Sequence, residues 1–112
     1  MSDESGDAGG VSAAAEGPVL LHIWEVDPAR EGIAEQRLDA MLGEASKEPG
    51  FVSARLLESP DRRSIAAVIE MRTVEDRRRL EQLPKVHDTL HHLDGTLNII
   101  VSLYHEVGRY DA

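Results

Sequence analysis

Histidine is the residue type in this sequence best suited to acid–base or metal chemistry. Three of the five histidines lie in the stretch VHDTLHHLDG, residues 86–95. At about 100° per residue, a helix here places His87 and His91 together at the border of an apolar stripe, with His92 on the opposite side. The stripe consists of Val86, Leu90 and Leu93. We therefore expect His87 and His91 to face a site and His92 to face solvent.

The His87–His91 pair is compatible with more than one role. Histidine titrates near neutrality, so either imidazole can act as a general base at cellular pH. Two histidines four residues apart can also ligate one metal ion, with His22 as a third ligand. The stretch lacks the glutamate of an H-E-x-x-H motif, so we expect no metal site. A second interpretation is that each of these histidines is simply half exposed at the border of the helix and has no chemical role.

The segment PVLLHIWEV, residues 18–26, is predicted to be the first strand. Both of its alternating faces are apolar, which is typical of a strand covered on both sides. Leu20, His22, Trp24 and Val26 share one face, and Val19, Leu21 and Ile23 share the other. His22 is therefore expected to point the same way as the only tryptophan of the chain.

The rest of the chain alternates between helical and strand patterns. Asp27-Pro28 predicts a helix start, Thr73 caps a later helix, and Pro84 is expected to break it. The remaining predicted elements are a first helix ending before Pro49-Gly50, strands over 51–59 and 64–72, a helical piece over 85–93 and a last strand over 97–107. This β-α-β-β-α-β order predicts an α+β, ferredoxin-like fold with an antiparallel sheet.

Composition narrows the class of protein. The chain has 112 residues, no cysteine and a net charge of −9, which argues against nucleic acid as a partner. Residues 1–17 are small, polar and acidic, and we expect a disordered tail rather than a signal peptide. No stretch is long and apolar enough to span a membrane. We expect one domain over residues 18–110 in a cytoplasmic protein.

Two stretches carry a resemblance to a known family. EPGFVSARLLESPD and AAVIEMRTVEDRRRL, followed by a histidine-bearing helix and a last strand, resemble the antibiotic biosynthesis monooxygenase superfamily over residues 18–110. The resemblance implies a homodimeric α+β barrel in which two ferredoxin-like sheets pack face to face. Where the family often has EWxSxED, this sequence has EMRTVED, so Met71 stands in place of the tryptophan.

The resemblance also implies a site and an activity. It places His22, Trp24 and Met71 on the helix-facing side of the sheet, below the histidines of the second helix. The implied function is a cofactor-independent monooxygenase or cyclase acting on an aromatic, polyketide-like substrate in secondary metabolism. The predicted catalytic residues are His87 and His22, and the predicted substrate-binding residues are Trp24, Met71, His91 and Tyr104. The Tyr104 phenol can donate to a developing oxyanion.

Two alternatives stay open. One is a haem-binding or haem-degrading protein with His87 as axial ligand, and the other is a non-catalytic small-molecule-binding or stress-response module. The sequence has no glycine-rich phosphate loop, no dinucleotide fingerprint and no G-x-S-x-G motif. Nucleotide cofactors and covalent serine hydrolysis are therefore not expected.

Overall fold

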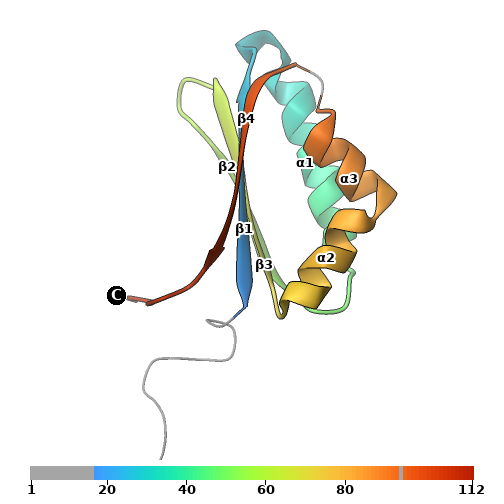
Figure 1. Ribbon diagram of the computed structural model, residues 1–112. Coiled ribbons are helices and arrows are strands. Elements are labelled where there is room, and N and C mark those ends of the chain that lie inside the picture. Colours follow the sequence, from blue (N-terminus) through green and yellow to red (C-terminus); the bar gives the residue numbers. More distant parts are fainter. Residues whose placement is uncertain (1–16, 94) are drawn as a thin grey trace, which may run out of the picture.

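The structure is a computed structural model in which residues 17–93 and 95–112 are described. A four-stranded antiparallel sheet, in the order β2-β3-β1-β4, forms one layer, and the helices form a second layer on one of its faces (Figure 1). The elements are β1 (Pro18–Val26), α1 (Glu31–Ala45), β2 (Phe51–Glu58), β3 (Ser64–Met71), α2 (Val74–Gln82), α3 (Pro84–His91) and β4 (Thr96–His105). The predicted α+β, ferredoxin-like fold is confirmed. The predicted tail lies outside the described residues, apart from Gly17.

Local signals in the sequence decide where the helices begin and end. The Asp27 carboxylate accepts a 3.0 Å hydrogen bond from the backbone N–H of Ala29 and starts a 3₁₀ turn that leads into α1. Thr73 Oγ1 accepts a 3.0 Å hydrogen bond from the Asp76 N–H and caps α2. Leu83, which precedes Pro84, is extended with φ −66° and ψ 130°, so α2 and α3 are separate helices. Within the described ranges, no helix has both the length and the apolar character to cross a membrane.

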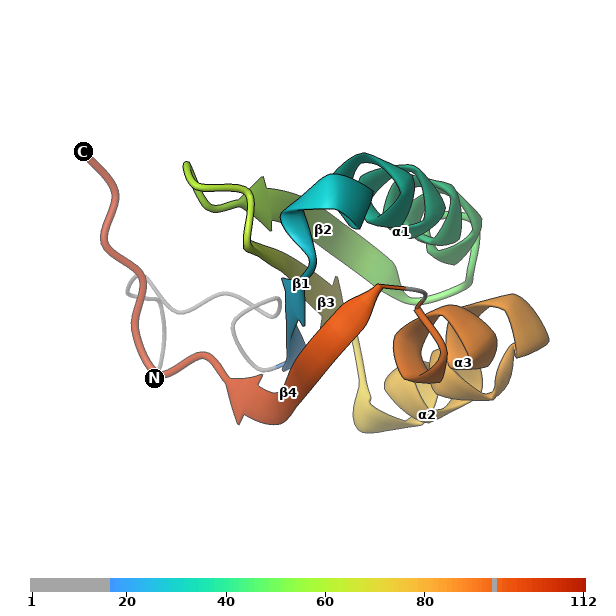
Figure 2. The ribbon, with the colours of Figure 1, turned by 90° about the horizontal axis from the view of Figure 1, so that it is seen from above.

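The register of the strands defines two sides of the sheet. His22 lies opposite Ala67 of β3 and Val101 of β4, and paired residues of an antiparallel sheet point to the same side. We call the side that carries His22 the helix side, because α1, α2 and α3 pack on it (Figure 2). We call the other the open side; it carries residues such as Leu21 and Tyr104.

The hydrophobic core lies between the helix side and the three helices. It includes Trp24, Leu38, Ile69, Met71, Leu80 and Val86, whose side chains have essentially no exposed surface. The helices leave the helix side of the edge strand β4 uncovered. Ile99, Val101 and Leu103 are 37%, 50% and 49% exposed, and we call these three residues the β4 strip.

Candidate functional site

The centre of the candidate site is a stacked pair of rings on β1. The His22 and Trp24 ring centroids lie 5.4 Å apart at an interplanar angle of 21°, and the two residues are 1% and 0% exposed. His22 Nδ1 and Trp24 Nε1 are both buried without a hydrogen-bond partner among the described residues. A buried polar atom without a partner costs about 1–3 kcal/mol. Two such atoms on adjacent rings are an unfavourable arrangement for a core and a suitable one for a ligand site.

Burial determines the charge of His22. Desolvation lowers the pKa of His22 from 6.5 to about 4, because the imidazolium form loses its hydration inside the protein. The negative charge of Glu81 opposes this shift and the positive charge of His91 adds to it. His22 is therefore neutral at neutral pH, where it is a hydrogen-bonding group and a weak base.

Helix α3 brings the other two predicted histidines next to each other. The His87 and His91 ring centroids are 4.6 Å apart, on the flank of a helix that buries Val86 and Leu90. The His87 side chain is 55% exposed, and His91 lies within electrostatic range of His22 on β1. His92 lies elsewhere, as predicted.

His92 lines a separate hollow of about 350 Å³ between α1 and α3. The other residues that line it are Arg37, Asp88, Thr89 and Leu93. His92 is therefore a natural control for His87.

Helix α2 contributes two residues that the sequence did not single out. Arg77 Nη1 donates a 2.7 Å hydrogen bond to Glu81 Oε1, and the two side chains are only 17% and 30% exposed. Arg77 Nε is buried and has no partner within the described part of the chain. Three consecutive arginines after two acidic residues are typical of a solvated, salt-bridged face, which describes Arg78 and Arg79 better than it describes Arg77. The signal in the sequence is helical spacing. Arg77 and Glu81 are four residues apart, and each directly follows a residue that is buried in α2, Asp76 and Leu80 respectively.

Two other predicted site residues, Met71 and Tyr104, do not lie beside the exposed histidines of α3. Met71 is on the helix side, as predicted, but it is fully buried in the core beside Ile69. Tyr104 is on the open side, where it pairs with Val19 of β1 and is 53% exposed. The structure therefore brings His22, Trp24, His87 and His91 to one side of the sheet and leaves Tyr104 on the other.

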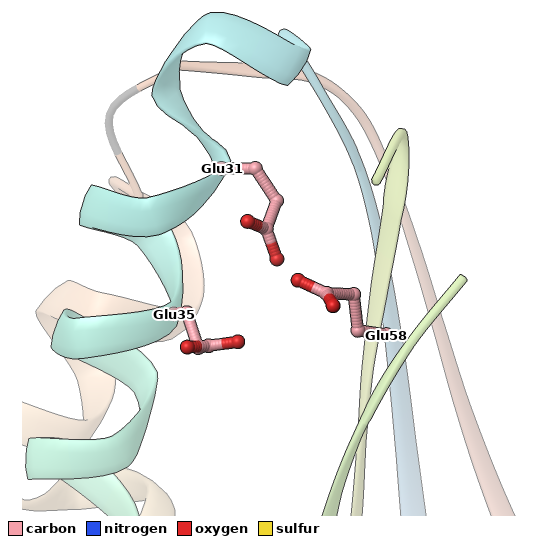
Figure 3. Close-up of side chains that lie close together, drawn as sticks. All are labelled: Glu31, Glu35 and Glu58. Atoms are coloured by element: carbon pink, nitrogen blue, oxygen red, sulfur yellow. The ribbon is translucent and has the colours of Figure 1, made fainter. Parts of the chain in front are cut away.

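A separate group of carboxylates lies where α1 begins beside the β2–β3 hairpin. One oxygen from each of Glu31, Glu35 and Glu58 lies within 4.8 Å of the others (Figure 3). Glu31 is fully buried, and its Oε1 accepts hydrogen bonds of 3.0 and 2.6 Å from Arg62. The guanidinium thus already supplies a positive charge to this group. Across residues 17–93 and 95–112, the histidines form no comparable group of three converging ligands.

The fold is shared with solved structures. No protein-family model and no curated protein sequence matches the chain. A conserved protein from Methanosarcina mazei superposes with a TM-score of 0.75 at 10% identity, over 84% of this chain and 96% of that one. A Nitrosomonas europaea protein with the provisional name antibiotic biosynthesis monooxygenase gives 0.74 at 13% identity, over 82% and 91%.

A third match carries a described activity. SnoaB from Streptomyces nogalater, a cofactor-independent oxygenase, superposes with a TM-score of 0.68 at 18% identity, over 86% of this chain and 96% of that one. The chain shares the α+β, ferredoxin-like fold of these three structures. Because all three identities are low, the matches establish the fold, and any activity has to be argued from the residues of this chain.

Proposed function

We propose that the protein is a small cofactor-independent oxygenase or cyclase that acts on an aromatic, polyketide-like substrate. The site is the helix-side group that consists of His22, Trp24, Arg77, Glu81, His87 and His91, which we call the His22 cluster. The observation that carries the proposal is the buried His22–Trp24 stack, whose two ring nitrogens have no partner. The shared fold with a cofactor-independent oxygenase supports it.

The two kinds of imidazole suit different steps. The exposed His87 can take a proton from a phenol or an activated ring carbon, since substrate can reach it. The buried, neutral His22 can orient the substrate by a hydrogen bond through Nδ1. The resulting carbanion or phenolate then reacts with O₂, and a ring CH₂ becomes a carbonyl while the second oxygen atom leaves as water. A cyclase would use the same deprotonation to add the carbanion to a carbonyl carbon of the same substrate; the C=O π bond breaks, and the resulting alkoxide takes the proton back from the imidazolium.

Oxygen uptake with a panel of hydroxylated anthrones and quinols tests this function. If His87 is the base, His87→Ala lowers turnover by about 10²–10⁴ while the protein stays folded. His92→Ala is the matched control, because it removes an imidazole at the C-cap of the same helix, where His92 lines a different hollow. Equal activity of the two variants at equal melting temperature would rule out His87 as the base. No uptake with any member of the panel would contradict the oxygenase.

We also propose that two copies pair through the open side to form a homodimer. On this side Glu70 Oε1 accepts a 3.0 Å hydrogen bond from Ser53, while Glu70 Oε2 is buried without a partner among the described residues. The C-terminal segment leaves the sheet on the open side, with Val107 and Tyr110 89% and 95% exposed (Figure 2). A second copy would cover this surface. A stable monomer at micromolar concentration in sedimentation velocity would contradict the dimer.

A further inference from the structure

We propose that Arg77, positioned by Glu81, binds an anionic group of the ligand, so that the His22 cluster selects planar aromatic acids over their neutral analogues. This inference rests on the proposed location of the site. It does not depend on whether the bound compound is oxygenated, cyclised or simply held.

The geometry of Arg77 supports this role. Its side chain is largely buried, and among the described residues its one hydrogen bond to a side chain runs from Nη1 to Glu81 Oε1. The buried Nε has no partner within the described residues, which leaves one edge of the planar guanidinium without its usual acceptor. That edge matches the two oxygens of a carboxylate. Glu81 holds the opposite edge and so fixes the direction in which the free edge points.

The placement of α2 relative to β1 connects this pair to the ring stack. Glu81 is close enough to His22 to act on its charge, as His91 of α3 also is. In α2 the residues Arg77 and Glu81 each follow a buried residue by one position, as His87 and His91 do in α3. Glu81 of α2 and His91 of α3 therefore both lie within electrostatic range of His22.

The β4 strip supplies the apolar half of the ligand site. Ile99 pairs with Trp24 and Val101 pairs with His22, so the strip continues the helix side directly beyond the ring stack. These side chains are about half exposed, and an aromatic ring laid on them would remove apolar surface from water. His22 is neutral at neutral pH, so the fixed positive charge that faces such a ligand is that of Arg77. A planar aromatic acid therefore fits the site, with its ring on the β4 strip and its acidic group at Arg77.

The test uses 2-naphthoate and its uncharged isostere 2-naphthamide as probes with the full-length protein. Calorimetry gives the two affinities, and the indole N–H resonance reports binding at the site because Trp24 is the only tryptophan. We expect 2-naphthoate to shift that resonance and to bind the wild type more tightly than 2-naphthamide. Arg77→Gln should weaken 2-naphthoate by about tenfold or more and change 2-naphthamide by less than about twofold.

Three further variants separate recognition from structure and from net charge. Arg78→Gln makes the same change of charge on the exposed neighbour of Arg77 and should leave both affinities unchanged. Glu81→Gln keeps an acceptor for Arg77 but removes a negative charge, so 2-naphthoate should bind about threefold more tightly. Arg77→Lys keeps the positive charge but loses the planar pair of N–H donors, so 2-naphthoate should bind with intermediate affinity. This variant also keeps the test valid if Arg77→Gln folds poorly.

Several outcomes would overturn the inference. The inference is wrong if the wild type binds 2-naphthoate and 2-naphthamide with equal affinity, or if it does not bind 2-naphthoate. Equal weakening of both probes in Arg77→Gln would mean that Arg77 is structural, and equal weakening of 2-naphthoate in Arg78→Gln would mean a long-range charge effect. Failure of the oxygenase alone would appear as tight, Arg77-dependent binding of 2-naphthoate with no oxygen uptake from the anthrone panel.

Discussion

The two sides of strand β1 are both largely apolar between Val19 and Trp24, yet one is buried and the other is not. On β1, Leu20 and Trp24 point to the helix side and are 2% and 0% exposed. Their neighbours Leu21 and Ile23 point to the open side and are only half buried. The difference therefore comes from what covers each side rather than from the residues. Alternation in a strand shows that two sides are apolar, but only the neighbouring elements show which one forms the core of the folded chain.

The buried polar groups also differ between the helix side and the open side. On the helix side, His22 and Trp24 contribute ring nitrogens that are enclosed by apolar core. On the open side, Ser53 and Glu70 bond to each other at a half-exposed surface. The open side is thus typical of a surface that pairs with another protein surface. The helix side, where these two ring nitrogens lack a partner among the described residues, is where we propose the ligand site.

A matched pair of leucines on β1 tests the contrast most strongly. Leu20→Ala removes a core side chain, and we expect it to lower the free energy of unfolding by about 2–5 kcal/mol at any protein concentration. Leu21→Ala alters the open side and should lower the free energy of unfolding of the monomer by about 1 kcal/mol or less. Its larger effect should appear as weaker self-association. Urea unfolding at two protein concentrations distinguishes the variants, and equal, concentration-independent losses would mean that both sides act as core.

The fold was predictable because its signals are local. The β1 strand was predicted with its observed bounds from a run of residues that is apolar on both faces, and the capping residues Asp27 and Thr73 marked the helix starts. Pro84 marked the break between α2 and α3. The ends of elements were less accurate, since β4 ends at His105 rather than at residue 107. No capping residue or proline marks the end of that strand.

The candidate site was only partly predictable. The shared side of His22 and Trp24 follows from strand alternation, and the adjacency of His87 and His91 follows from helical spacing. Arg77 was missed because three consecutive arginines suggest a solvated face, although a helix cannot point three neighbours in one direction. Glu31 was missed because an acidic residue in the first turn of a helix is usually solvated. Its burial depends on Arg62, which is distant in sequence and lies in the β2–β3 turn.

The pH dependence of stability tests whether the helix side really encloses a neutral His22. The folded protein holds the pKa of His22 at about 4, against 6.5 for a free side chain, so between these values the unfolded chain binds a proton that the folded chain does not. Stability from this residue is therefore complete above about pH 6.5 and is lost as the pH falls toward 4. After a discount for partial solvation, we expect a loss of about 2 kcal/mol.

His22→Leu should remove that part of the pH dependence. Urea unfolding at pH 7.5 and pH 4.5 measures it, and His92→Leu is the matched control because His92 is exposed. The wild type and His92→Leu should lose stability in parallel, while His22→Leu should lose less. Parallel loss in all three proteins would mean that His22 becomes protonated without cost and that the helix side is open to water at this point.

Neighbouring residues of β4 give the smallest and most local test. Val101 belongs to the β4 strip and Ile100 points to the open side, and they are similarly exposed at 50% and 47%. Because both side chains are half in water, each change to alanine should cost about 0.5–1 kcal/mol of stability. The two variants should differ in function instead. Val101→Ala should weaken binding of 2-naphthoate by about two- to threefold, since it removes apolar surface beside His22, and Ile100→Ala should weaken only self-association. Calorimetry and sedimentation on both variants measure these effects, and a reversal of the two phenotypes would place the ligand on the open side of the sheet.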